Sequence, residues 1–308
     1  MPFLPLGGQA VIEGVMMRSP TQVAVAVRRP DGSLAFLEKR FESITRRVKP
    51  LGWPVLRGAV SLFETLSLGI TALNFSADES STESPQATKP GLGWQIAQVL
   101  TVVVSLGLGM LLFVALPARL TEWLGFHDRV SFGLVDGAFR LLAFVGYLWL
   151  ISQWKEMARV LGYHGAEHKA IHALEAGAPL TPESVQTFPR LHPRCGTTFL
   201  FLVVVVSIVV FTFIGKPANL GQHLLRIACM PLIAGVAFEF IRLSGKYFGN
   251  PVVRALAWPG MQFQRLTTRE PDLDMCAVAI ASLEKVMHDP ALDAARRAGG
   301  LKEVSFVQ

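Results

Sequence analysis

The sequence predicts an α-helical integral membrane protein with about four transmembrane helices, a small N-terminal β-meander and cytoplasmic helices. Hydrophobic residues make up 51% of its 308 residues and charged residues only 17%, whereas about a quarter of the residues of soluble proteins are charged. The mean hydropathy is +0.41. This composition argues against a disordered chain, a coiled coil and a typical soluble enzyme.

Residues 1–52 are predicted to form a cytoplasmic β-rich domain. Residues 9–17 are rich in Val, Ile and Met, and residues 23–28 alternate valine with alanine. An Asp-Gly dipeptide, which is a strong turn signal, precedes a second alternating stretch over residues 34–41. We therefore expect a meander of about three strands.

The next segment, residues 53–75, is predicted to be an interfacial helix or a helix packed beneath the transmembrane helices. It is apolar but carries Arg57 and Glu64, which favours this position over the alternative of a fifth transmembrane helix. Residues 76–94 begin with a run of Ser, Asp, Glu and Thr. Because such a run has little apolar surface to bury, we expect a flexible linker there.

Four apolar segments are predicted to cross the membrane, because each approaches the length of about 20 residues that a spanning helix needs. They are residues 95–116, 134–151, 198–214 and 223–241. The second contains Asp136 and Arg140, and the fourth contains Arg226 and Glu239. For all but the first segment, buried helices of a soluble protein are therefore the alternative interpretation.

Basic residues predict the orientation, because Lys and Arg of membrane proteins are enriched in cytoplasmic loops. Ten lie in residues 1–94, five in 152–197 and nine in 242–308, against two in 117–133 and one in 215–221. Both termini, the loop 152–197 and the region 242–308 are therefore expected to be cytoplasmic. The net charge of +6 indicates contact with the lipid bilayer and no specific nucleic acid.

The cytoplasmic loop contains a helical segment, residues 163–175, that is predicted to carry the chemistry. On a helix, where each residue advances about 100°, five of its polar side chains fall on one stripe about 140° wide. These side chains are His164, Glu167, His168, His172 and Glu175. A solvated polar face and a network of histidine–carboxylate hydrogen bonds are the alternatives to a ligand-binding site.

His164 and His168 have the spacing with which imidazoles on adjacent turns bind one divalent metal ion, and zinc suits such ligands. The frame His164-x-x-Glu167-His168 also matches the inverted zinc-protease pattern. In that pattern the glutamate is the general base for a metal-bound water. We therefore predict a zinc site with Glu167 as its catalytic residue.

Further residues are predicted to complete this site at the cytoplasmic end of the transmembrane helices. His192 and Cys195 directly precede the third apolar segment, and Glu239 lies near the end of the fourth; all three are predicted metal ligands. Supporting positions are assigned to His172, Glu175, Glu13 and Arg194. The alternatives are a structural turn at His192 and Cys195, an ion pair of Glu239 with Arg226 or Arg242, and one of Glu13 with Arg18.

Four blocks of the sequence resemble the YqhQ-like family of bacterial membrane proteins, a family of unknown function that is labelled as predicted metal-dependent enzymes. The blocks are Gly7–Arg18, Tyr163–Lys169, His192–Thr197 and Pro259–Pro271. They extend over nearly the whole chain. The resemblance implies a multi-pass protein of the bacterial cytoplasmic (inner) membrane, and it implies no established activity.

Three functions agree with these features. The first is a metal-dependent hydrolase at the cytoplasmic membrane boundary, acting on membrane proteins or lipid head groups. The second is a non-catalytic chaperone, assembly factor or translocon-associated scaffold, which the large basic cytoplasmic portion favours. The third is a transporter, which the charged residues inside the predicted transmembrane helices favour.

Overall fold

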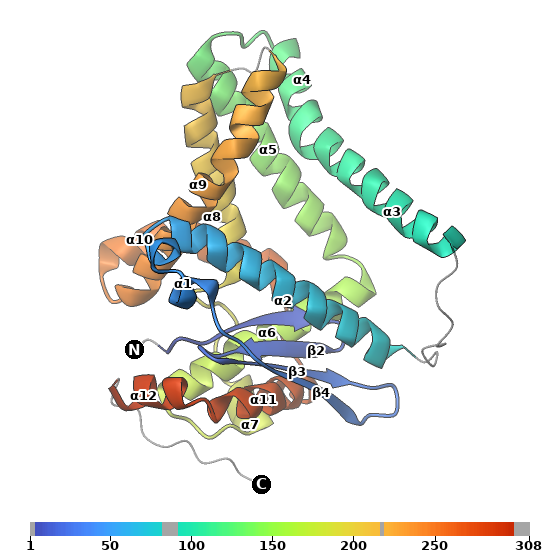
Figure 1. The fold of residues 1–308 in the computed structure, drawn as a ribbon, viewed down its shortest axis with the longest axis vertical. Helices are drawn as coiled ribbons and strands as arrows, with labels where there is room; N and C mark the ends of the chain where they lie inside the picture. Colours follow the sequence, from blue (N-terminus) through green and yellow to red (C-terminus); the bar gives the residue numbers. More distant parts are fainter. Residues whose placement is uncertain (1–3, 82–91, 216–218, 299–308) are drawn as a thin grey trace.

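The computed structural model describes residues 4–81, 92–215 and 219–298 (Figure 1). The fold is mostly helical with one small antiparallel sheet near the N-terminus, as the sequence predicts. Long apolar helices form one end of the molecule, and the sheet with several shorter helices forms the other (Figure 1). Of the predicted linker 76–94, residues 82–91 lie outside the described residues.

The sheet has four strands, where about three were expected. They are β1 (Gly7–Val11), β2 (Gly14–Arg18), β3 (Gln22–Arg28) and β4 (Leu34–Arg40), antiparallel in the order β1-β2-β3-β4. The expectation of a single strand over residues 9–17 is wrong, because a tight turn at Ile12 and Glu13 pairs Val11 with Gly14. Glu13 adopts a φ of 51° in this turn, a conformation that its apolar neighbours do not signal.

Helices cover both faces of the sheet. One face, with Ala24, packs against α6 (Lys155–Ala176) and α11 (Leu273–Met287). The opposite face, with Val25, packs against α2 (Leu56–Ser80). Because successive side chains of a strand point to opposite faces, the alternating apolar residues of β3 contribute to both hydrophobic cores.

The helix α2 corresponds to the predicted helix over residues 53–75 and extends beyond it. It runs across the long apolar helices rather than along them, between those helices and the sheet (Figure 1). Its first turn packs closely on α9 (Leu220–Lys246), where Gly58 faces Gly235. Its position relative to a membrane stays a prediction.

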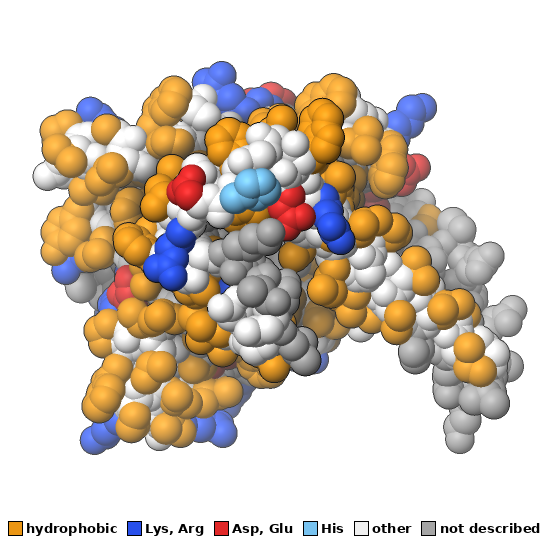
Figure 2. Space-filling model, turned by 90° about the horizontal axis from the view of Figure 1, so that it is seen from above, with side chains coloured by type: hydrophobic (Ala, Val, Ile, Leu, Met, Phe, Trp, Pro, Cys, Tyr) orange, Lys and Arg blue, Asp and Glu red, His pale blue; other side chains and the backbone are white. Residues whose placement is uncertain are grey.

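Five helices are long and apolar enough to cross a membrane, and α2 is one of them. The other four contain the four predicted transmembrane segments, so the number of about four spans stays a prediction. The first passes through α3 (Leu92–Met110), a π-helical turn (Leu111–Ala115) and α4 (Leu116–Trp123), and the others lie in α5 (Arg129–Ile151), α8 (Gly196–Ile214) and α9. Seen from the end that these helices form, many hydrophobic side chains surround a central group of acidic, basic and histidine side chains (Figure 2).

Three charged residues inside these helices, Asp136, Arg140 and Arg226, have partners within the group of α5, α8 and α9. Arg140 forms an ion pair with Asp136 at 3.0 Å. Arg226 donates a hydrogen bond to the carbonyl of Gly215 at 2.6 Å and lies over the ring of Phe211.

The remaining elements are short or lie on the side of the sheet. They are α1 (Ile44–Arg47), the 3-10 helix η1 (Lys49–Gly52), α7 (Pro182–Gln186), α10 (Pro251–Thr267) and α12 (Pro290–Ala298). Of these, α10 packs against α8 at the end nearest the sheet, and this contact positions the site described next.

Candidate metal centre

The helix α6 carries most of the candidate site into the interior. Its second half is buried between the sheet and α11, although the residues are His, Glu, Lys and Ala. Small residues make this possible: Ala166, Ala170 and Ala173 are fully buried, and Gly165 lies against the carbonyl oxygen of Arg269. The alternative of a solvated polar face is wrong, because the polar stripe of this helix faces protein.

Three of the predicted ligands come together. The ligand atoms of His164, His168 and Cys195 all lie within 4.8 Å of one another. The Nε2 atom of His164 is 3.2 Å from the Sγ atom of Cys195, and the two imidazole rings are 4.5 Å apart. Cys195 is the residue that caps the start of α8, so the cluster joins α6 to the base of an apolar helix.

Backbone carbonyls fix the orientation of both imidazoles. The Nδ1 atom of His164 is 2.6 Å from the carbonyl oxygen of Thr267, and the Nδ1 atom of His168 is 2.6 Å from that of Arg190. When an Nδ1–H group donates to a carbonyl, Nε2 is the atom of the neutral ring that can bind a metal ion. Histidine ligands of metal ions are held in this way in most proteins.

Glu167 lies beside this cluster, and its side chain is buried. Among the residues that the structure describes, its Oε2 atom has no hydrogen-bond partner. Strand β1 approaches the carboxylate so closely that a Cβ atom on Gly8 would lie 2.7 Å from its Cδ atom. Burial raises the pKa of Glu167, and the imidazoles of His164 and His168 oppose this rise.

The sulfur of Cys195 and the imidazole of His164 lie in hydrogen-bond contact, and each favours the charged form of the other. Burial disfavours the charged form of either group. The neighbouring sulfur nevertheless raises the pKa of His164 to about 9, and His164 and His168 hold the pKa of Cys195 well below its usual value. These neighbours therefore favour the thiolate of Cys195, which is the form of cysteine that binds metal ions.

A second cluster adjoins the first and contains His172, Glu175 and His192. The guanidinium of Arg194 pairs with Glu175 and donates to the carbonyl of Leu4 at 2.6 Å. Burial lowers the pKa of His172 to about 4 and that of His192 to about 3, so both rings are neutral. Because Arg194 already supplies the positive charge, this cluster is a hydrogen-bonded network next to the first.

Two predicted residues, Glu239 and Glu13, neither belong to a cluster nor are described beside one. Glu239 accepts hydrogen bonds from Arg57 at 2.6 and 2.5 Å, so neither proposed partner, Arg226 or Arg242, is its main contact. Glu13 binds Arg159 at 2.5 Å and Tyr163 at 3.2 Å. We do not retain Glu239 as a ligand or Glu13 as a supporting residue, because each carboxylate is engaged by a guanidinium.

The residues that orient the site are not evident from the sequence pattern. Gln264 makes two hydrogen bonds to the backbone of His192. Its side-chain oxygen accepts from the His192 N–H at 2.8 Å, and its side-chain nitrogen donates to the His192 carbonyl at 2.7 Å. Thr267 and Arg190 contact the imidazoles through backbone carbonyls. Every residue has such a carbonyl, so the residue type does not reveal this role. Gly8, Gln264 and Thr267 do lie within blocks that resemble the YqhQ-like family, and that was the one available signal.

Comparison with known proteins agrees with this resemblance. Residues 53–289 match the profile of a family described as "Protein of unknown function (DUF1385)". The chain is 32% identical over 302 residues to "Uncharacterized protein YqhQ" of Bacillus subtilis (strain 168), and the alignment covers 93% of each chain. No solved structure matches the chain.

Proposed function

The chain belongs to the DUF1385 family of proteins of unknown function, and we propose that it is a membrane-embedded, metal-dependent hydrolase. One observation carries the proposal: His164, His168 and Cys195 converge beside Glu167, a buried carboxylate with one oxygen that no described residue contacts by a hydrogen bond. Catalytic zinc sites commonly have three protein ligands and keep a position for water. Two imidazoles and a thiolate are donors that zinc favours.

The protein residues have separable tasks in this proposal. His164, His168 and Cys195 would hold the metal ion, and the carbonyls of Thr267 and Arg190 keep the two rings in the ligating tautomer. A bound zinc ion supplies Lewis acidity and lowers the pKa of its water. Glu167 would accept the proton of that water through its free Oε2 atom.

The position of the cluster favours a substrate at the cytoplasmic membrane boundary. Cys195 directly precedes an apolar helix. The sheet, α6 and α11 all lie at the same end of the molecule, which the distribution of basic residues assigns to the cytoplasm (Figure 1). We infer a protein of the bacterial cytoplasmic membrane that acts on a membrane protein segment or a lipid head group.

A second candidate is a non-catalytic scaffold in which the same ion is structural. The depth of the site favours it, since Glu167 is 5%, His168 2% and Cys195 4% exposed. Structural zinc sites are closed by four protein ligands. In this case Glu167 would be the fourth ligand, and the centre would fasten the cytoplasmic elements to the base of α8.

Metal content tests whether there is a centre at all. Full-length protein, purified without chelators, is expected to contain about one zinc ion per chain. The double variant His164→Ala/His168→Ala should lose it. The double variant His127→Ala/His288→Ala, which removes two exposed histidines, should keep it. Metal-free wild-type protein, isolated in a folded state from a zinc-replete culture, would refute both candidates.

The variant Glu167→Gln separates the two candidates. If Glu167 is a general base, the variant should bind zinc as tightly as the wild type and lose its biological activity in complementation of a deletion strain. If Glu167 is a ligand, zinc affinity should fall by about 10- to 100-fold or more. Full complementation by a zinc-loaded Glu167→Gln protein would remove the hydrolase.

A further inference from the structure

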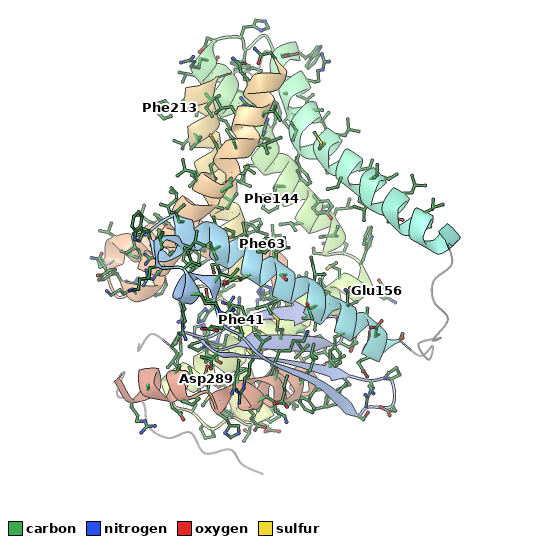
Figure 3. All side chains as sticks on the ribbon, in the orientation of Figure 1. Phe41, Phe63, Phe144, Glu156, Phe213 and Asp289 are labelled. Carbon is green, nitrogen blue, oxygen red and sulfur yellow. The ribbon has the colours of Figure 1, made fainter. Side chains whose placement is uncertain are left out.

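The two sides of α2 differ in what covers them. The side that carries Leu68 and Ala72 packs on the sheet. The opposite side carries five large apolar side chains in one stripe, each between 39% and 69% exposed: Leu62, Phe63, Leu66, Ile70 and Leu73. In Figure 3, Phe63 lies above the α2 ribbon, and Phe41, which packs against the sheet core, lies below it.

The exposed stripe is uninterrupted by charge. At about 100° per residue, its five members fall within an arc of about 100°. The ionisable residues of the same helix, such as Glu64, lie outside that arc. An apolar surface of this size is costly in water, so it marks a contact with lipid or with another apolar partner.

The sheet prevents α2 from crossing a membrane, although the helix is long and apolar enough. Contacts with the sheet run from Glu64, which pairs with Arg18, through Ser76, whose hydroxyl accepts from Ile12 at 3.2 Å, to Glu79. These positions are separated by about 22 Å along the helix. A spanning α2 would therefore carry the whole sheet, including exposed charges of β4, into hydrocarbon.

The chain just before α2 combines exposed cationic and apolar side chains. Arg46, Arg47 and Lys49 are exposed, and Arg47 is paired with Glu42. Trp53 is 63% exposed. Exposed apolar side chains accompany them at Ile44, Val48 and Leu56. Basic residues beside an exposed tryptophan are typical of a surface that binds anionic lipid head groups.

We propose that α1, η1 and α2 together form an in-plane platform on the anionic cytoplasmic leaflet. The stripe Leu62–Leu73 lies among the acyl chains, and Arg46 and Lys49 contact lipid phosphates. The sheet and α6 then lie on the side of this platform that faces away from the bilayer. The proposal rests on the membrane location inferred above and is independent of the metal chemistry.

Depth measurements test the orientation of α2. Full-length protein carrying Cys229→Ser and one of Leu62→Cys, Leu66→Cys, Ile70→Cys or Leu73→Cys is labelled with a polarity-sensitive fluorophore in lipid nanodiscs. The native cysteines Cys195 and Cys276 are buried. An in-plane helix gives a lipid-like emission and the same depth at all four positions, measured with nitroxide-labelled lipids.

Two results would overturn this orientation. Depths that change steadily, by about 16 Å from residue 62 to residue 73, would mean that α2 spans the bilayer. Labels that emit as in water would mean that nothing covers the stripe. Labels that are shielded from both lipid and aqueous quenchers would mean that a protein partner covers it. If the protein is soluble without detergent, the membrane location itself fails, so the two failures are distinguishable.

Lipid selectivity tests the basic part of the platform. A fluorophore at Val48→Cys should be quenched by nitroxide-labelled phosphatidylglycerol in preference to phosphatidylcholine. The variant Arg46→Gln/Lys49→Gln should weaken this preference by up to about thirtyfold. The control Lys285→Gln/Arg297→Gln makes the same charge change on α11 and α12 and should not alter it. An unchanged preference in the first variant would overturn the anionic-lipid contact.

Discussion

Glu167 is the residue whose surroundings depend most on distant parts of the chain. Its neighbours His164 and His168 belong to its own helix, but β1 contributes the backbone that closes over its carboxylate. A side chain on that strand would occupy the space of the carboxylate. Glycine at position 8 therefore permits the close packing of β1 on Glu167.

The variant Gly8→Ala should move Glu167 without unfolding the protein. Its Cβ atom would lie 2.7 Å from the Cδ and Oε1 atoms of Glu167, which is the flexible end of a side chain. We expect a loss of about 1–3 kcal/mol of stability, seen as a fall of the melting temperature by a few degrees. Gly7→Ala meets nothing within 4 Å and should leave the melting temperature unchanged. Equal effects of the two substitutions would contradict this packing.

Asp289 joins the sheet to the C-terminal helices and should make stability depend on pH. It accepts hydrogen bonds from Ser19 at 2.6 Å and Thr21 at 2.8 Å. Burial alone would raise its pKa, but these bonds lower it. A lowered folded-state pKa stabilises the protein above the unfolded pKa of about 3.9, and this contribution is lost as the pH falls through the folded value.

The variant Asp289→Ala is therefore expected to lose about 1–3 kcal/mol of its free energy of unfolding at pH 7. It should unfold at a lower temperature than the wild type. Thermal unfolding followed between pH 7 and pH 3 should show this difference shrinking in acid. The control is Asp274→Ala, which removes a 75% exposed partner of Arg28 and should cost less than about 1 kcal/mol. A difference that stays constant with pH would argue against ionised Asp289 as its source.

At the scale of elements, the contact between α2 and α9 is set by glycine. A Cβ atom on Gly58 would lie 2.8 Å from the Cα atom of Gly235. The ion pair of Arg57 with Glu239 closes the same contact. The close approach aligns α2 across the apolar helices and leaves its stripe of apolar side chains uncovered.

The variant Gly235→Val should separate α2 from α9, because its Cβ atom would collide with the carbonyl oxygen of Val55. Overpacking of this kind costs about 1–3 kcal/mol, and a fall of the melting temperature in detergent would report it. Gly109→Val on α3 meets nothing within 4 Å and serves as the control. Similar melting temperatures for the two variants would show that the contact is not close.

At the scale of the whole molecule, the candidate metal centre connects parts that are far apart in sequence. Its ligands come from α6 and from the start of α8, and α10 orients them through Thr267. His164 and Cys195 are separated in sequence by the rest of α6, by α7 and by the segment that contributes His192 to the second cluster. A metal ion bound at this centre should therefore raise the stability of the whole protein and not only that of one element.

Removal of the metal is expected to lower the melting temperature of the whole protein. A ligand present at about a thousand times its Kd stabilises the folded state by about 4 kcal/mol. Thermal unfolding with and without a strong chelator measures this difference, and added zinc should restore the original value. The double variant His164→Ala/His168→Ala should already unfold at the lower temperature and should not respond to the chelator. A chelator-sensitive double variant would place the ion elsewhere.

Local pattern was sufficient for the helices and for the core of the site. Apolar runs of about 20 residues require helical backbone in an apolar surrounding, so the helices that contain the four predicted segments follow from composition. His164, Glu167 and His168 lie on one helix, where spacing alone puts their side chains on the same side. Cys195 could also be predicted as a ligand, because it directly precedes an apolar segment at the predicted cytoplasmic membrane boundary.

Tertiary structure alone decided which carboxylates and carbonyls reach the site. Glu239 is an ionisable residue in an apolar helix, and sequence does not reveal that Arg57, 182 residues away, neutralises it. The turn at Glu13 requires a positive φ that no neighbouring residue signals. Sequence by itself determined the long apolar helices and the histidine stripe, because both arise from contacts within a few residues. The partners of each charged group depend on which helices pack together, and packing is a property of the folded chain.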